Sequence, residues 1–183
     1  MKLFFFLTLL LLICSCSENV TVKESEIYEI RNIGTLSTTE YTVGKVVKLS
    51  DGGEWYKYGD RKILMSCKAR IKAGIDLNEI REEDIKADGT KIEITLPQPK
   101  IVSFEMDPRL VKTEMKEVNG FRSDFSQDEK NRIMQLGEKA IRKDLKELRI
   151  LEDANDNAKQ FVREFYGQMG FEEVIIHESK KST

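Results

Sequence analysis

The sequence has few of the residues that build metal sites and disulfide frameworks. Its 183 residues include 3 cysteines, 1 histidine and 3 prolines, and 30 basic residues stand against 32 acidic ones, for a net charge of −2. A structural zinc site needs about four Cys or His ligands, and nucleic-acid binding usually requires a basic excess. We therefore expect no bound metal, no cofactor and no nucleic-acid partner.

Common phosphate-binding and hydrolytic motifs are also missing. Gly52-Gly53 is not followed by the Lys-Ser/Thr pair of a phosphate loop, and neither G-x-G-x-x-G nor G-x-S-x-G occurs. The single histidine, His177, alternates with Ile175 near the C-terminus, which favours packing at a strand edge or on the surface over catalysis. Apolar residues nevertheless make up 40% of the chain, which is enough for a folded core.

The N-terminus resembles a bacterial export signal. Met1-Lys2 supplies a positive charge, and residues 3–13 are apolar apart from Thr8. As a helix this stretch would rise only about 16 Å, against roughly 30 Å of hydrocarbon in a bilayer. These features indicate a signal peptide and not a membrane span.

The signal ends in a sequence that resembles a bacterial lipobox. Ile13 stands three residues and Ser15 one residue before Cys16, the position of the lipidated cysteine. This resemblance implies a diacylglyceryl thioether on Cys16, usually with a third acyl chain on its amine, and several acyl chains anchor a protein stably. The alternative is ordinary cleavage after Ser17. We expect a lipid-anchored membrane protein of the bacterial cell envelope, with its domain in the periplasm.

Cys67 lies in a run with apolar residues at every second position, which is typical of a strand with one buried face. The run is Ile63, Met65, Cys67, Ala69, Ile71 and Ala73. If Cys14 is removed with the signal and Cys16 carries lipid, Cys67 has no partner for a disulfide within the chain. We expect a buried, inert thiol.

Strand patterns precede helical patterns along the chain. Ile27, Ile30 and Ile33, followed by Gly34, suggest a short amphipathic helix. Strands are expected over 38–49, 61–73, 91–96 and 100–106, with Pro97 and Pro99 ending the third.

The last third reads as two helices and a strand. A capping box, Ser126 to Glu129, begins the first helix. The expected apolar stripes are Ile133, Leu136, Ala140, Ile141, Leu145 and Leu148, and then Leu151, Ala154, Ala158, Phe161, Phe165 and Met169. Residues 171–178 are expected to form a closing strand.

These patterns predict one α+β domain. It has a mostly antiparallel sheet, two long C-terminal helices packed on that sheet, and a closing C-terminal strand. The expected divisions are a lipoprotein signal peptide over 1–15, a lipid-bearing tether over 16–25, the domain over 26–178 and a frayed tail over 179–183.

The segment from Trp55 to Lys62 interleaves aromatic and basic residues. Trp55, Tyr58 and Arg61 are candidate partner-binding residues, because large amphipathic side chains are enriched at interaction hot spots. The alternative is an aromatic plug beneath a loop, with an Asp60–Arg61 contact in a turn.

We interpret the acidic run Glu82-Glu83-Asp84 as solvent-exposed charge near the N-terminus of a helix and not as a cation site. The abundance of carboxylates leaves open a hydrolase acting on envelope glycans.

Several blocks of the chain resemble the uncharacterised domain of unknown function (DUF) family 4230. They are Leu36 to Tyr41, Gly59 to Leu64, Lys72 to Leu77 and Leu96 to Pro99, and Phe121-Arg122-Ser123 and Gly170-Phe171 continue them over roughly residues 34–177. The resemblance implies a membrane-tethered bacterial envelope protein, and the family has no assigned activity, so no catalytic residue is carried over. A non-catalytic binding or assembly module is the favoured function, and the carboxylate-dependent hydrolase is the alternative.

Overall fold

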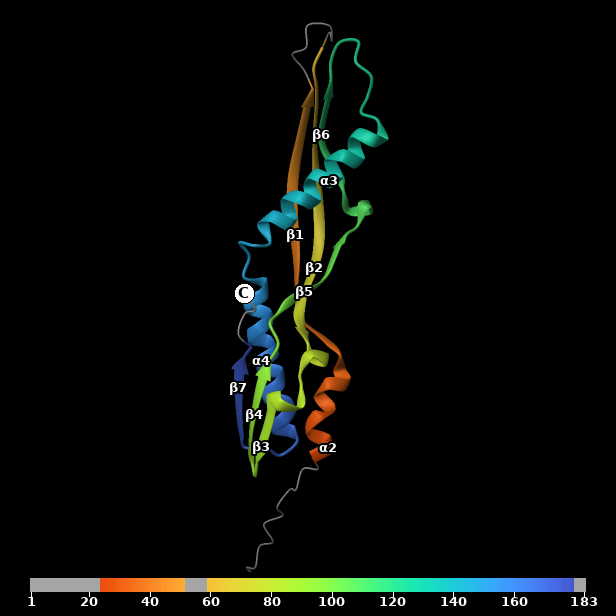
Figure 1. Ribbon diagram of the computed structural model, residues 1–183. Coiled ribbons are helices and arrows are strands. Elements are labelled where there is room, and N and C mark those ends of the chain that lie inside the picture. Colours follow the sequence, from red (N-terminus) through yellow and green to blue (C-terminus); the bar gives the residue numbers. More distant parts are fainter. Residues whose placement is uncertain (1–23, 52–58, 180–183) are drawn as a thin grey trace, which may run out of the picture.

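The computed structural model describes residues 24–51 and 59–179, which form an elongated molecule (Figure 1). Its strands are β1 (Thr35–Asp51), β2 (Arg61–Asp76), β3 (Ile85–Asp88), β4 (Lys91–Leu96), β5 (Lys100–Met106), β6 (Lys112–Val118) and β7 (Glu173–Glu178). Its α-helices are α2 (Glu24–Ile27), α3 (Gln127–Asp144) and α4 (Ile150–Gln168). Short 3-10 helices are η2 (Tyr28–Ile33), η3 (Leu77–Glu79), η4 (Glu82–Asp84) and η5 (Pro108–Leu110). The predicted α+β class is confirmed.

The longer of the two sheets is built around β2. This strand pairs with β1 along its whole length, from Arg61 opposite Asp51 to Asp76 opposite Thr35. On its other side β6 pairs with one half of β2 and β5 with the other half, and every pair is antiparallel. Two short strands therefore share one side of a long hairpin, which extends from the middle of the molecule to its upper end (Figure 1).

A second, smaller sheet consists of β3, β4 and β7. β3 and β4 are antiparallel, whereas β4 and β7 are parallel, with Lys91 opposite Glu173. The sequence predicted one mostly antiparallel sheet, and the division into two sheets is a structural finding. β7 can run parallel to β4 because α4 intervenes and supplies the crossover that a parallel pair needs.

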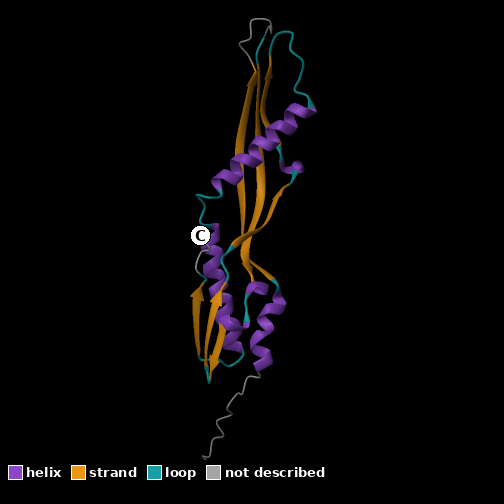
Figure 2. Cartoon of the chain, in the orientation of Figure 1, coloured by secondary structure: helices purple, strands orange, loops and turns teal. Residues whose placement is uncertain are grey.

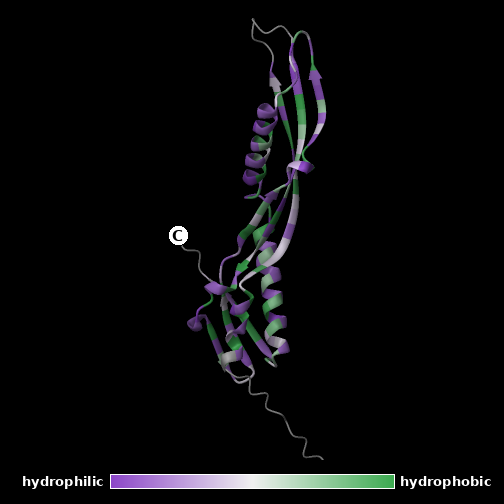
Figure 3. Cartoon of the chain, turned by 90° about the vertical axis from the view of Figure 1, so that its right-hand side faces the viewer, coloured by the Kyte–Doolittle hydropathy of each residue, from purple (hydrophilic) through white to green (hydrophobic). Residues whose placement is uncertain are grey.

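The alternating pattern of β2 is confirmed. Ile63, Met65, Cys67, Ala69, Ile71, Ala73 and Ile75 are all buried. The Cys67 thiol is fully buried, and this burial raises its pKa. A raised pKa keeps sulfur in the unreactive thiol form, as the sequence predicted. The alternation of hydrophobic and hydrophilic residues along the long strands can be followed in Figure 3.

Helix α3 begins at the predicted capping box and crosses β1 and β2 (Figure 2). Its buried face is Ile133, Gly137 and Ile141. The predicted stripe is wrong at Leu136, which is 43% exposed, because the face that meets the sheet follows a spacing of four residues. Gly137 takes the central position because a Cβ there would lie 2.8 Å from the sulfur of Cys67.

Helix α4 packs on the lower part of the long hairpin and on β7. Ala154 and Ala158 are buried as predicted, and Val162 and Tyr166 continue their face. Leu151 differs from the prediction and is 38% exposed. Tyr166 is fully buried and its hydroxyl donates a hydrogen bond of 2.9 Å to the carbonyl of Ile27, which joins α4 to the start of the domain.

Candidate functional site

The candidate site lies at the upper end of the long hairpin, where β1 ends and β2 begins (Figure 1). Asp51 and Arg61 are the last pair of the ladder. The connection between them holds the predicted partner-binding residues Trp55 and Tyr58, which lie outside the described residues. Arg61 is described, and its environment shows how this end is built.

Arg61 points into the molecule. The residue is 7% exposed, and its guanidinium lies 2.7 Å from the carboxylate of Asp51 and 2.7 Å from that of Glu129. It also stacks over the ring of Phe125, 4.7 Å from the centroid. The hydrogen bonds to Asp51 and then to Glu129 raise the pKa of Arg61. A partner-binding role was predicted for Arg61, and that role stays a prediction. In the structure the Arg61 guanidinium joins the end of the hairpin to the start of α3.

Arg122 completes a cluster of four charges, which we call the ion-pair cluster: Asp51, Arg61, Arg122 and Glu129. The Arg122 side chain is 12% exposed and lies 2.5 Å from the Asp51 carboxylate. Glu129 also accepts the backbone N–H of Ser126, and this bond, with the Arg61 contact, lowers its pKa. The Glu129 carboxylate, held by these donors, stays ionised and acceptor-only at neutral pH.

The loop between β6 and α3 lies against the end of the hairpin. A Cβ at Gly59 would lie 2.2 Å from the carbonyl oxygen of Asn119, and Gly59 has a φ of 104° that a side chain would strain. The neighbouring Phe121 is 96% exposed. Exposed apolar side chains mark interaction surfaces when they gather in one place.

Sequence reasoning missed Phe121 as a functional candidate. The sequence did contain a signal for it. Phe121 directly follows the Asn119-Gly120 turn, and turns and loops lie on the protein surface. We call the connection 52–60 together with Phe121 the distal tip. Arg61, which follows the connection, and Arg122, which follows Phe121, both donate hydrogen bonds to the carboxylate of Asp51.

The acidic run shows no catalytic arrangement. Glu82, Glu83 and Asp84 form η4, where Asp84 accepts the backbone N–H of Arg81 and Glu83 lies 3.1 Å from its guanidinium. Among the described residues, the carboxyl groups whose pKa is clearly shifted are Asp76, Glu93, Asp107, Asp124, Glu129 and Glu178, and every shift is a lowering. A general acid requires the opposite direction.

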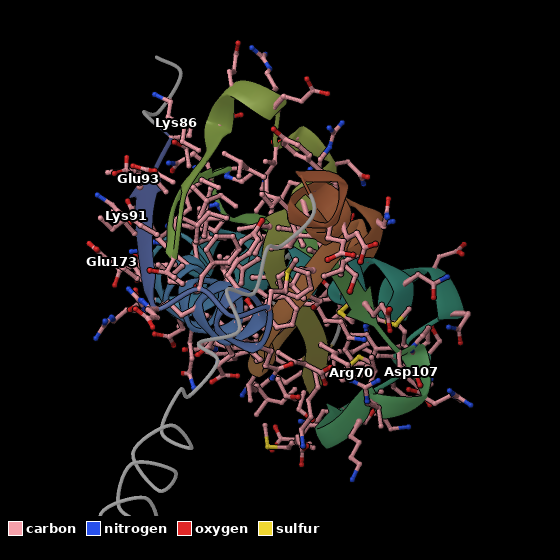
Figure 4. All side chains as sticks on the ribbon, turned by 90° about the horizontal axis from the view of Figure 1, so that it is seen from below. Arg70, Lys86, Lys91, Glu93, Asp107 and Glu173 are labelled. Carbon is pink, nitrogen blue, oxygen red and sulfur yellow. The ribbon has the colours of Figure 1, made fainter. Side chains whose placement is uncertain are left out.

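Other chemistry-bearing side chains form surface ion pairs. His177 is 55% exposed as a side chain, with Nε2 3.8 Å from Glu93. Figure 4 shows Glu93 with Lys86, Lys91 and Glu173 on the outer side of the small sheet, all pointing to solvent. Arg70 and Asp107 lie together on another side of the molecule. Within 24–51 and 59–179, no three Cys, His, Asp or Glu side chains form a group that could hold a metal ion.

The comparison with protein families identifies the chain. Residues 28–176 match the model described as Protein of unknown function (DUF4230). The chain belongs to the DUF4230 family. No match was found among curated proteins or among solved structures.

The DUF4230 match begins within η2 and ends within β7, so it spans both sheets and both long helices. It includes the ion-pair cluster, Phe121 and residues 52–60, so the whole distal tip falls within the matched residues. The resemblance read from the sequence is confirmed. Across the described part of the chain, none of the helices has the length and apolar character needed to cross a bilayer.

Proposed function

We propose that this DUF4230 protein is a lipid-anchored protein of the bacterial cell envelope, with a non-catalytic binding or assembly role. In this proposal Cys16 carries the lipid, and the distal tip contacts an envelope partner. One observation carries the proposal: α2, where the described chain begins, and the end of β1, after which the aromatic-basic connection follows in the sequence, lie at opposite ends of the molecule (Figure 1).

The separation between these ends follows from the length of β1. A strand of 17 residues spans about 55 Å at about 3.3 Å per residue. A lipid on Cys16 would tether the α2 end by a few residues of chain. The end of β1, from which the aromatic-basic connection continues, would then lie far from the bilayer, so that a partner bound there need not touch the anchoring membrane.

The construction of the distal end supports a binding role. The ion-pair cluster and the Arg61–Phe125 contact join the described end of the hairpin to the segment that leads into α3. Preorganised segments lose less entropy when they bind. Phe121 supplies exposed apolar surface at this place, and the aromatic residues of the connection have the amphipathic character that interfaces favour.

The anchor is tested by fractionating cells that express the full chain. Cys16→Ser is expected to move the protein from the membrane to the soluble fraction and to remove the lipid mass. Cys14→Ser is the matched control, because it changes a neighbouring thiol that the lipobox does not lipidate. A soluble wild type, or equal fractionation of wild type and Cys16→Ser, would contradict the anchor.

The tip is tested by crosslinking in native membranes. Trp55→Ala, Tyr58→Ala and Phe121→Ala should each keep the fold and lose crosslinked partners, because truncation of an interface hot spot costs about 2 kcal/mol or more. Leu136→Ala is the control, since Leu136 is an exposed apolar residue on α3 away from the tip. If the tip variants crosslink as the wild type does, the tip is not the binding surface.

A further inference from the structure

A polar groove lies in the other half of the molecule, between η2, the η3–η4 segment and the end of β4. A hollow of 720 Å³ is lined by Arg31, Asn78, Thr95 and Gln98 among others. A second hollow of 360 Å³ adjoins it and is lined by Tyr28 and Asn32. Both are lined by Arg31 and Asn78, so they form one continuous groove.

Arg31 is the feature of this groove that the fold does not explain. Its side chain is half-buried, yet it makes no ion pair or hydrogen bond with the residues of 24–51 and 59–179. Its backbone is fixed, because its carbonyl accepts the N–H of Gly34 at 3.1 Å. A guanidinium offers five N–H donors in a planar fork, and leaving such donors partly desolvated and unpaired is unfavourable.

The other charged groups that line the larger hollow, Glu79, Arg81 and Asp84, already have partners, whereas Glu29 lines the second hollow without one among the described residues. Lys100 lies 3.0 Å from Asp76 and 2.9 Å from Glu79, and Arg81 lies 3.1 Å from Glu83. These contacts leave Glu79 and Arg81 engaged on the rim of the groove. Arg31 therefore stands as the one unpaired cation among the described residues that line it.

The groove has the dimensions and the lining of a site for a small polar molecule. Ligand pockets of about 300–1,000 Å³ hold compounds of this size. Amide and hydroxyl side chains from Asn78, Gln98 and Thr95 can donate or accept, which matches a ligand with several hydroxyl groups. The carboxylates on the rim are further acceptors for hydroxyl hydrogens.

We propose that this groove binds an acidic saccharide of one or two rings, with its carboxylate on Arg31 and its hydroxyls on the surrounding amides. Arginine binds a carboxylate through two parallel N–H···O bonds, which gives both affinity and orientation. This function is separate from partner binding at the distal tip, and neither proposal depends on the other.

The test is an NMR titration of the full-length chain, labelled with ¹⁵N and kept in a non-ionic detergent. Sodium D-glucuronate is the probe, with D-glucose and sodium succinate at matched ionic strength as comparisons. Glucuronate should shift the Nε–Hε resonance of Arg31 and the amide signals of Asn78 and Gln98. Its affinity should exceed that of glucose and of succinate by at least tenfold.

Variants assign the carboxylate contact. Arg31→Gln should weaken glucuronate binding at least tenfold and leave the affinity for glucose unchanged, whereas Arg31→Lys should restore part of the loss. Arg163→Gln is the control, because Arg163 is an exposed arginine on α4 outside the groove. Equal affinity for glucuronate and glucose, succinate binding as tight as glucuronate binding, or an unchanged affinity in Arg31→Gln would each overturn the proposal. An absence of shifts with every probe would overturn it as well.

Discussion

The two ends of this DUF4230 protein are stabilised in different ways. The end that holds α4, the small sheet and η2 has a large cluster of buried residues, including Ile30, Ile92, Val162 and Tyr166. Near the distal tip the buried cluster consists only of Ile63, Met65, Phe125 and Ile133 among the described residues. At this end the ion-pair cluster accompanies a small buried core. We therefore expect the free energy of local unfolding to be lower at the distal end than in the rest of the molecule.

The largest effect is expected from Tyr166→Ala in the large core. Truncation of a fully buried aromatic side chain usually costs about 3–5 kcal/mol, and this one also loses its hydrogen bond to Ile27. Chemical denaturation should show the loss, and native-state hydrogen exchange should show reduced protection throughout the large core, from η2 to the small sheet and α4. Loss of protection confined to α4 would contradict a single cooperative core.

Arg61→Met should have a smaller and more local effect. Breaking a fully buried ion pair costs about 3–5 kcal/mol, but the Asp51 and Glu129 side chains are 28% and 32% exposed, so about 2 kcal/mol is expected. Hydrogen exchange should increase in β6, the hairpin end and the first turns of α3. A uniform increase along the chain would show that the two ends are not energetically distinct.

Gly137→Ala tests the close approach of α3 to β2 between the two ends. The added methyl group would lie 2.8 Å from the Cys67 sulfur, so a loss of about 1–2 kcal/mol is expected despite the better helix propensity of alanine. Gly167→Ala is the matched control, because nothing lies within 4 Å of its added Cβ, and it should stabilise α4. Adding Cys67→Ala should relieve the Gly137→Ala penalty, and additive effects in the double variant would exclude this contact as its cause.

The smallest effect concerns pH. The folded state lowers the pKa of Glu129, so its contribution to stability is present above the unfolded value of about 4.3 and is lost as the pH falls through the folded pKa. Glu129→Gln should therefore be less stable than wild type at pH 7, and the difference should shrink towards pH 3. Urea unfolding at several pH values measures it. A constant difference would assign the effect to packing instead of charge.

The sequence predicted the elements of this fold better than their assembly. Strong local signals marked β2, β4, β5 and the start of α3, because alternation and a capping box are properties of neighbouring residues. The parallel pairing of β7 with β4 depends on residues about 80 positions apart, and no local pattern encodes it. Leu136 and Leu151 were assigned to the core because a count of apolar residues does not show which side of a helix meets the sheet.

The candidate sites were less predictable than the fold. The sequence does not show whether the Arg61 side chain is exposed in a turn or buried in an ion-pair cluster. The fold decides this by bringing Asp51 and Glu129, which are far apart in the sequence, to the same guanidinium. Arg31 gave no signal at all, because its lack of a partner is a property of the assembled groove. Phe121 was detectable in principle, through its position after a turn.

The length of β1 also has a mechanical consequence. If the molecule were pulled along its long axis between α2 and the distal tip, the tension would pass through the covalent backbone of β1. An extended strand already rises about 3.3 Å per residue, close to the limit of about 3.3–3.6 Å for any chain. The backbone of β1 can therefore lengthen very little under tension. It would transmit a force from one end of the molecule to the other before its hydrogen bonds to β2 break.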